Sequence, residues 1–368
     1  MGNIYTSKVF INEEMHRAVK EVLDSGIFIF GKKTKEFEQR FAELVGTKYA
    51  IAISNGTTAI EVVLLSLGIG KSDEVIVPSH TAFPTIEPIL RVGAKPVFVD
   101  IDERYYTLDP KLAEAAITPK TKAIIPVHLY GQATDIAPLK ALCQKHHLFL
   151  IEDCCQAHHA LYHGQPVGSF GVAGCFSFYP SKNITVCGEG GMIVTNDPKV
   201  ERTCHILLHH GQDGTYNHVL LGNNYRLSEL HCALGLEQLK QVEYFTRRRR
   251  EIAALYTQAL QDVSGIISFP EEASYARHVY HLYVIRVPAA QRSRIMEELK
   301  TEGIFCGIHY PIACHQQKAL LTLFPEQPTL PITEKIIHEI LTLPIYPLLK
   351  DEEVLMICEK LKRIMNNS

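Results

Sequence analysis

The first 200 residues alternate between short apolar runs and longer amphipathic stretches. The apolar runs predict strands, which cover residues 49–53, 74–77, 96–99, 123–127, 148–152, 174–178 and 192–195. Helical spacing of apolar residues between most of these runs predicts helices over 58–67, 84–92, 110–117 and 136–146. Asp109 as N-cap and Pro110 at the first helical position mark the start of the third helix. Continuous Val, Ile and Phe runs that alternate with helices are typical of a mostly parallel α/β sheet covered on both faces.

The pattern changes at about residue 227. A long helical stretch over 227–260 carries four consecutive arginines, which we interpret as a solvated helix face. Strands follow near 281–287 and 304–309, and helices near 289–301, 333–341 and 351–365. We therefore predict a large α/β domain over 1–245, which includes an N-terminal helical segment, and a smaller C-terminal α+β domain over 246–368.

Composition agrees with a two-domain globular protein. The chain has 368 residues, of which 46% are hydrophobic and 21% are charged, so a disordered polymer and a collagen are excluded. The net charge of −3 argues against a nucleic-acid partner, and no apolar run approaches the ~20 residues that span a membrane. The N-terminus lacks the apolar core of a signal peptide.

The cysteines and histidines bear on the redox environment of the protein and on metal binding. The ten cysteines follow no framework spacing and form no C-x-x-C pair, which favours a reducing, cytoplasmic setting. The eighteen histidines include no H-E-x-x-H motif, and we assign no metal site.

The segment Ser54–Thr58, with the sequence SNGTT, lies between a predicted strand and a predicted helix. Gly and small hydroxyl residues at a helix N-terminus suit an anion, because the N–H groups face outward and the helix dipole favours negative charge. The same residues also cap ordinary helices. The segment alone leaves both interpretations open.

Two ionisable residues follow predicted strands. Asp153 comes at the carboxyl end of an apolar strand, where ligands bind in open α/β sheets, although a loop Asp that caps the next turn is the plainer interpretation. Lys182 follows another apolar strand and precedes the glycine-rich segment 188–191. Most lysines are solvated, but small and aromatic neighbours lower an amine pKa and favour Schiff-base chemistry. The segment 221–227, with the sequence LGNNYRL, precedes the long helix, and its plain interpretation is a turn with Asn as N-cap.

The order of these segments along the chain indicates one class of enzyme more specifically than any single segment does. A helix N-terminus for a phosphate, an Asp at a strand end and a Lys 29 residues later are laid out as in fold type I enzymes that use pyridoxal 5′-phosphate (PLP). The chemistry needs a lysine amine for the cofactor aldehyde, a carboxylate for the pyridine nitrogen and N–H groups for the phosphate.

The sequence resembles the DegT/DnrJ/EryC1/StrS family of PLP-dependent sugar aminotransferases along nearly its whole length. Eight segments carry the resemblance in order: SNGTTAIEVVLLSLGIG, DEVIVPSHTAFPTIEPIL, AKPVFVDID, PVHLYGQATD, LIEDCCQAHHALYHGQPVGSFG, CFSFYPSKNITVCGEGGMIVTND, HHGQDGTYNHVLLGNNYRLSELHCALGLEQL and GIHYPIACHQQKAL. It implies an aspartate aminotransferase-like fold of type I, with a mostly parallel central sheet in the large domain.

The resemblance also implies roles for individual residues. Lys182 would hold the cofactor covalently and then move a proton as acid and base, Asp153 would pair with the pyridine nitrogen, and Gln156 would reach the phenolic oxygen. Gly56, Thr57 and Ser177 would bind the phosphate.

Two further cofactor contacts are implied. Asn224 matches an Asn that the neighbouring subunit contributes to the phosphate, which implies a homodimer with active sites at the subunit interface. Ala82 stands where relatives often have an aromatic residue, so Phe83 or His80 would stack on the ring.

Lysine rather than histidine at position 182 favours transamination over sugar dehydration or deoxygenation within the family. The expected reaction moves the amino group of L-glutamate to a keto group of a nucleotide-linked sugar for amino-sugar, polysaccharide or glycan biosynthesis. The segments 309–311 and 315–316 resemble the sugar-facing loop of members that aminate 3-oxo hexoses, so His309 and His315 are either sugar contacts or polar residues of a structured loop. Arg226 would hold a carboxylate or phosphate. We therefore favour a dTDP-linked 3-oxo-6-deoxyhexose. The alternatives are a 4-oxo sugar, a non-catalytic PLP-binding regulator, or a lyase that acts on a free amino acid.

Overall fold

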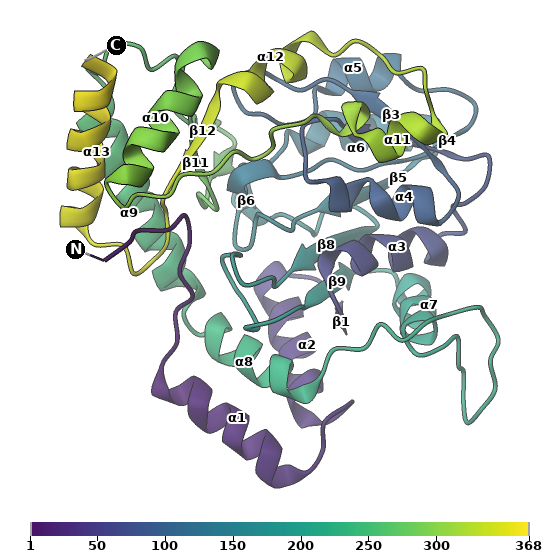
Figure 1. Ribbon diagram of the computed structural model, residues 1–368. Helices are drawn as coiled ribbons and strands as arrows, with labels where there is room; N and C mark the ends of the chain where they lie inside the picture. The colour runs from purple at the N-terminus through teal and green to yellow at the C-terminus, as the bar shows by residue number, and fades with distance from the viewer. Residues whose placement is uncertain (1, 367–368) are drawn as a thin grey trace.

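A seven-stranded sheet forms the centre of the computed structural model, which describes residues 2–366 (Figure 1). The strand order is β1-β9-β8-β5-β4-β2-β3, and only β9 runs antiparallel to its neighbours. The strands are β1 (Tyr49–Ile53), β2 (Glu74–Pro78), β3 (Lys95–Val99), β4 (Thr121–Ile124), β5 (Phe149–Asp153), β8 (Ala173–Ser177) and β9 (Gly191–Thr195). All seven predicted strands of this region and the mostly parallel sheet are confirmed.

Helices cover both faces of this sheet. Along β1, Ala50 and Ala52 belong to one hydrophobic core, and Ile51 and Ile53 belong to the other, as the two-residue period of a strand requires. On the first face pack α2 (Lys32–Val45), α5 (Pro110–Ala115), α6 (Ile136–His146) and α8 (Glu229–Leu239). On the second face pack α3 (Gly56–Ser66), α4 (Glu87–Arg91) and α7 (Pro198–Leu208). Helix α1 (Glu13–Ser25) packs outside α8.

Local capping explains where two of these helices begin. Asp109 accepts a hydrogen bond from the Lys111 N–H (2.8 Å), so the predicted start of α5 is confirmed. The Asn55 side chain accepts from the Thr58 N–H (2.8 Å), and the Thr58 hydroxyl accepts from the Asn55 N–H (3.3 Å), which completes a capping box at α3.

The C-terminal part has its own hydrophobic core, which begins on α9 (Val242–Leu260) at Ile252. Helices α10 (Ala289–Thr301) and α13 (Asp351–Asn366) and the antiparallel pair β11 (Tyr283–Arg286) and β12 (Ile340–Leu343) complete it. Helices α11 (Lys318–Leu323) and α12 (Pro331–Glu339) connect it to the large sheet. Figure 1 shows this part to one side of the sheet, with both chain ends close to it.

Short elements complete the chain. Strands β6 (Leu161–Tyr162), β7 (Gln165–Pro166) and β10 (Ala276–Arg277) form a small three-stranded sheet. Three 3-10 turns are η1 (Phe83–Thr85), η2 (Leu129–Gly131) and η3 (Cys314–Gln316). The predicted domain boundary near residue 245 falls inside α9 and stays a prediction. None of the described helices is both long and apolar enough to cross a membrane.

Four sequence predictions about individual elements were wrong. The helix over 227–260 is two helices. Helix α8 packs on the core of the large sheet, the chain turns at Lys240 and Gln241, and α9 continues into the C-terminal core. Residues 304–309 make only isolated pairings, at Ile304 and Gly307. The helix over 333–341 ends at Glu339, since the next residues pair with β11. The helix over 84–92 is interrupted by two prolines and divides into η1 and α4.

Candidate active site

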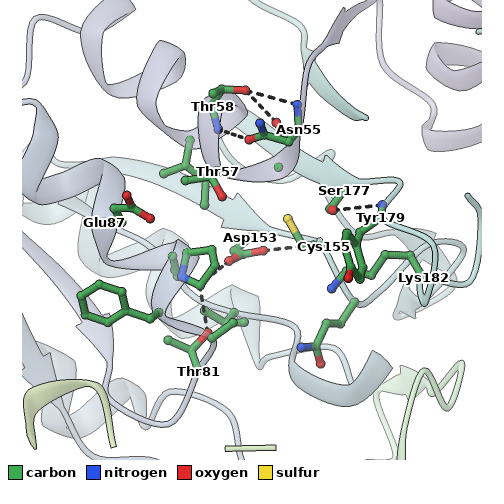
Figure 2. A pocket seen from close by; sticks show the side chains of 18 of the residues that line it. Asn55, Thr57, Thr58, Thr81, Glu87, Asp153, Cys155, Ser177, Tyr179 and Lys182 are labelled. Atoms are coloured by element: carbon green, nitrogen blue, oxygen red, sulfur yellow. Dashed lines mark hydrogen bonds between the residues drawn. The ribbon is translucent and has the colours of Figure 1, made fainter. Parts of the chain in front are cut away.

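A cavity of about 880 Å³ opens at the carboxyl ends of the parallel strands, between the sheet and the C-terminal part. Eight of the residues singled out from the sequence lie in its wall, and Figure 2 shows several of them facing one another across it. They are Gly56, Thr57, Phe83, Asp153, Gln156, Ser177, Lys182 and His309. Asn224, Arg226 and His315 lie outside this wall.

The N-terminus of α3 forms one corner of the cavity with Ser177 at the end of β8. A Cβ atom on Gly56 would lie 2.7 Å from the Cys155 Sγ and 2.8 Å from the Ser177 Cβ, so only glycine lets the helix approach this closely. The exposed N–H groups of the first turn, with the hydroxyl groups of Thr57 and Ser177, suit a phosphate. Asn55 meanwhile caps the helix, so both interpretations of the SNGTT segment apply at once.

Asp153 is the last residue of β5 and is almost fully buried. Its Oδ2 accepts a hydrogen bond from the Thr85 hydroxyl (2.8 Å), and its Oδ1 accepts one from the Cys155 N–H (3.0 Å). These donors hold the carboxylate in the cavity wall, and Figure 2 shows Asp153 beside Cys155. A carboxylate in this setting can hold a protonated pyridine nitrogen.

Lys182 lies in a turn after β8, where its N–H donates to the Tyr179 carbonyl (2.8 Å). Burial lowers the pKa of its amine, and the Cys155 thiol and the Asp153 carboxylate act in the opposite direction. The lower pKa leaves more of the amine neutral, which is the form that attacks a carbonyl.

Gln156 is oriented by two hydrogen bonds. Its Oε1 accepts from the Tyr130 N–H (2.7 Å), so its Nε2 is the end that donates to the Tyr310 hydroxyl (2.9 Å). Both Gln156 and Tyr310 line the cavity. The amide therefore presents a donor to this side of the site, which suits a phenolic oxygen.

The two residues predicted as stacking partners differ in position. Phe83 lies in the cavity wall at the start of η1. His80 is buried outside this wall, with its Nε2 hydrogen-bonded to the Tyr130 hydroxyl (2.8 Å). Phe83 is thus placed for contact with a ring in the cavity, and His80 is not.

Of the two histidines predicted to contact the substrate, one lines the cavity and the other does not. His309 lines the cavity, and its Nδ1 is bonded to the Thr342 hydroxyl (2.9 Å). His315 is buried elsewhere, between the Ser79 hydroxyl (2.7 Å) and the Glu334 carboxylate (3.2 Å). Because both ring nitrogens have protein partners, His315 holds η3 against β2 and α12.

Asn224 and Arg226 lie on the loop that precedes α8. The Arg226 Nε donates to the Asn224 Oδ1 (2.9 Å); Asn224 is exposed, whereas Arg226 is partly buried. They do not line the cavity of their own chain, whereas Asn223 does. Their predicted roles therefore depend on a second subunit and stay predictions.

Several cavity residues were not among the predicted contacts. His281, Thr6 and Ser7 come from segments that the sequence does not bring near Lys182. Burial, together with the Lys182 charge, lowers the pKa of His309 to about 4, and the pKa of His281 falls well below its ordinary value. Both imidazoles are therefore neutral at neutral pH. Tyr310, next to His309, and Cys155, two residues after Asp153, could have been found from their positions in the chain.

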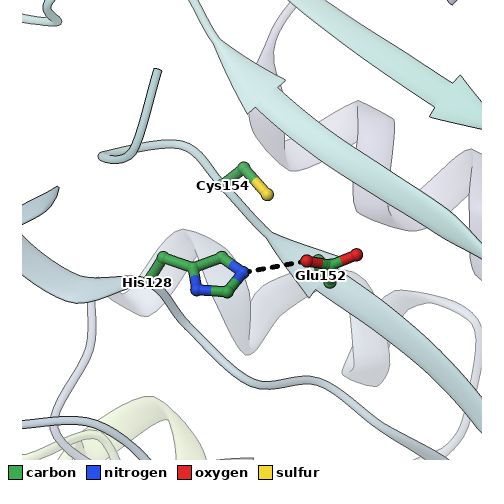
Figure 3. A group of neighbouring side chains, drawn as sticks. All are labelled: His128, Glu152 and Cys154. Atoms are coloured by element: carbon green, nitrogen blue, oxygen red, sulfur yellow. Dashed lines mark hydrogen bonds and ion pairs between the residues drawn. The ribbon is translucent and has the colours of Figure 1, made fainter. Parts of the chain in front are cut away.

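A second cluster lies behind β5, where the possible ligand atoms of His128, Glu152 and Cys154 are within 4.8 Å of one another (Figure 3). The Glu152 carboxylate accepts from three backbone N–H groups of residues 168–171, at 2.8–2.9 Å, and contacts the His128 Nε2 at 3.1 Å. The His128 Nδ1 in turn accepts from the Thr134 N–H (3.0 Å). These interactions explain the cluster as a support for the turn that follows β7, and we assign no metal to it.

The residues of the large cavity fit PLP. A glycine-lined helix N-terminus suits its phosphate, a buried and hydrogen-bonded carboxylate suits its ring nitrogen, and an amine of lowered pKa suits its aldehyde. Fold and site together define a PLP-dependent aminotransferase of fold type I.

Comparison with known proteins identifies the family. The chain belongs to the DegT/DnrJ/EryC1/StrS aminotransferase family, whose profile matches residues 9–362. Solved relatives hold the cofactor in its pyridoxal or pyridoxamine form.

Three relatives show how close the similarity is. A UDP-N-acetyl-3-dehydro-α-D-glucosamine 3-aminotransferase of Acidithiobacillus ferrooxidans is 40% identical over 97% of this chain and 95% of its own. A dTDP-3-amino-3,6-dideoxy-α-D-galactopyranose transaminase of Aneurinibacillus thermoaerophilus is 40% identical over 95% of each chain. The crystal structure of DesV from S. venezuelae superposes with a TM-score of 0.95 at 35% identity, over 99% of this chain and 98% of DesV.

Proposed function

We propose that this enzyme transfers the amino group of L-glutamate to the 3-keto group of a nucleotide-linked sugar in amino-sugar or polysaccharide biosynthesis. The observation that carries the proposal is the convergence of Lys182, Asp153 and the α3 N-terminus on one cavity. Its volume of about 880 Å³ is large enough for a substrate as well as the cofactor. A dTDP-linked 3-oxo-6-deoxyhexose is the favoured acceptor, and the two relatives named for 3-amino sugars support this choice of ring carbon.

Each cavity residue has a role in this reaction. PLP, when bound, supplies an electron sink and a carrier for the amino group. Lys182 would hold its aldehyde and would move a proton between substrate and cofactor, a task for which an amine of lowered pKa is suited. Asp153 would hold the protonated ring nitrogen, and Gln156 would donate to the phenolic oxygen.

We further propose that the active enzyme is a cytoplasmic homodimer in which each subunit completes the other's site. Two exposed apolar segments support an interface: residues 27–30, with the sequence IFIF, and Leu220 and Leu221 on the loop before α8. Asn224 and Arg226 lie on that same loop, outside their own cavity. In the dimer, Asn224 would contact the cofactor phosphate in the neighbouring subunit's site. Arg226 would contact a phosphate or carboxylate of the substrate in that same site.

The two half-reactions test the activity. Glutamate should convert the absorption spectrum of the bound cofactor from the pyridoxal to the pyridoxamine form, and a nucleotide-linked 3-keto sugar should convert it back. Lys182→Ala should lower turnover by about 10²–10⁴-fold or more, because the proton-transfer group is lost. A panel of dTDP- and UDP-linked 3-keto and 4-keto sugars identifies the acceptor.

Three results would contradict the proposal. If only 4-keto sugars convert the cofactor back to the pyridoxal form, the enzyme aminates carbon 4 of the sugar and not carbon 3. A bound cofactor that glutamate leaves unchanged would indicate a regulatory protein. Product formed from a free amino acid without a sugar would indicate a lyase.

A further inference from the structure

Residues 4–10 form a strap that runs from the C-terminal part of the molecule to the large domain (Figure 1). At one end, the Ile4 N–H donates to the Gly303 carbonyl (2.9 Å), and the Ile4 carbonyl accepts from the Phe305 N–H (2.8 Å). The Ile4 side chain is buried in the C-terminal core, and Tyr5 stacks on Phe305 with ring centroids 4.8 Å apart. This end is therefore held by both backbone and side chains.

The other end of the strap is held by the large domain. The Phe10 carbonyl accepts a hydrogen bond from the Gln238 Nε2 (2.8 Å), a side chain of α8. The Phe10 ring packs edge-on against Phe245, with centroids 5.3 Å apart. Because both ends are held, the residues between them have a defined position.

The middle of the strap passes along the cavity, and Thr6 and Ser7 belong to its wall. The Thr6 carbonyl accepts from the Ile345 N–H (3.2 Å). A Cβ atom on Gly307 would lie 3.5 Å from the Thr6 Cγ2 and 2.8 Å from the His309 Cε1, so Thr6 and His309 flank the same glycine.

Ser7 lines two cavities together with Lys182. Besides the cavity, it lines a small recess of about 20 Å³ that Ser181 and Lys182 also line. The strap thus contributes two hydroxyl-bearing residues to the wall that Lys182 and His309 also line.

We propose that Thr6 and Ser7 bind the sugar ring of the acceptor substrate and help to determine which keto sugar is aminated. This inference rests on the proposed function. The keto carbon must come beside Lys182 to receive the amino group, so side chains next to Lys182 and His309 face the sugar. Hydroxyl groups pair with sugar hydroxyl groups, whereas a diphosphate or the two carboxylates of glutamate call for cationic partners.

The chemistry around the strap supports a neutral ligand. His281 and His309 also line the cavity, and both are uncharged because burial lowers their pKa. The cofactor phosphate is expected at the α3 N-terminus, with Gly56, Thr57 and Ser177. Thr6, Ser7 and the two histidines therefore form a polar, uncharged wall that suits a sugar.

Thr6→Val and Ser7→Ala test the inference, because each removes a hydroxyl group with little change in size. Each half-reaction is followed separately by the cofactor spectrum, first with glutamate and then with the keto sugar that wild type uses best. The glutamate half-reaction should stay within about twofold of wild type. The kcat/KM for the keto sugar should fall about three- to tenfold for each variant, as expected for one hydrogen bond.

Tyr5→Phe is the matched control. It removes a hydroxyl group from the same strap, but this hydroxyl accepts from the Asn3 Nδ2 (3.3 Å) and lies outside the cavity wall. Both of its half-reactions should match those of wild type, and the three variants should share the wild-type Tm.

The possible outcomes separate the two proposals. If wild type is active and Thr6→Val and Ser7→Ala are unchanged, the strap inference is overturned. It is also overturned if both half-reactions fall together, or if Tyr5→Phe has the same effect. A wild-type enzyme that aminates no nucleotide-linked keto sugar overturns the proposed function and this inference with it.

Discussion

Glu38 is a partly buried carboxyl group that the active site does not use. It lies on α2, and its Oε1 accepts a hydrogen bond from the Ala52 N–H of β1 (2.9 Å). Burial raises its pKa from 4.5 to about 7; Glu201 and Glu229 also raise it, whereas the Ala52 hydrogen bond and Lys35 lower it. The fold thus favours the protonated form near neutral pH.

Glu38→Gln should stabilise the protein in a pH-dependent way. Because the folded-state pKa is raised, the wild type has the full contribution of Glu38 below pH 4.5 and loses it as the pH rises towards 7. The variant cannot ionise, so it should gain roughly 2–3 kcal/mol over wild type between pH 5 and pH 8. Denaturant unfolding at fixed protein concentration measures this difference.

The exposed Glu36, on the same helix, provides the control. Glu36→Gln should change the free energy of unfolding by less than about 0.5 kcal/mol at either pH. An equal effect of Glu38→Gln at pH 5 and at pH 8 would show that Glu38 does not titrate in this range.

At the scale of single residues, the sequence identified some residues of the cavity wall and misplaced others. Asp153 and Lys182 could be singled out because each follows an apolar strand, and parallel strands place their carboxyl ends at one edge. His315 was expected to face the substrate, but its neighbour Cys314 packs in the core and the imidazole is engaged by Ser79 and Glu334. Nothing local distinguishes it from His309, which lines the cavity.

At the scale of elements, the beginning of α2 depends on a distant carboxylate. Gly31 occupies the N-cap position and has no side chain to cap the helix. Instead, the Glu229 carboxylate of α8 accepts from the Gly31, Lys33 and Thr34 N–H groups, at 2.9, 2.9 and 2.8 Å. Glu229 is almost fully buried, so α8 supplies the cap from 198 residues away.

Glu229→Ala should destabilise the protein by about 2–4 kcal/mol, because three N–H groups lose their acceptor in a buried site. Amide hydrogen exchange in the first turn of α2 should accelerate more than elsewhere. Asp109→Ala removes a local and more exposed cap from α5 and should cost only about 1 kcal/mol. Equal losses for the two variants would contradict the role of Glu229.

At the scale of the whole molecule, the two halves are joined by polar contacts as well as by α9. Asp100, just after β3, accepts from the Ile332 and Thr333 N–H groups at the start of α12, both at 2.9 Å. The strap of residues 4–10 adds a second connection on the other side of the cavity. The cavity between the halves is therefore supported from both domains.

The proposed shared sites predict that two inactive variants can complement each other. In a mixture of Lys182→Ala and Asn224→Ala subunits, a hybrid dimer has one site that lacks both groups and one intact site. With random exchange of equal amounts, about a quarter of wild-type activity should return. Turnover measured before and after exchange detects this gain.

The matched control mixes Lys182→Ala with Asp153→Ala subunits, since both residues line the cavity of the same chain. No site in that hybrid is intact, so no activity should return. If the Asn224→Ala mixture also stays inactive after proven exchange, the sites are not shared.

The sequence by itself determined the seven strands of the large sheet, helices α3, α5 and α6, and the order of the chemical groups of the large domain. Apolar periodicity, the Asp109 cap and the strand-end positions of Asp153 and Lys182 are local properties, which a short window of sequence contains. Only the tertiary structure decided the rest. The break before α9, strand β12, the Glu229 cap and the strap residues of the cavity wall depend on contacts between segments that are far apart in the chain, and no local preference encodes which distant segments will meet.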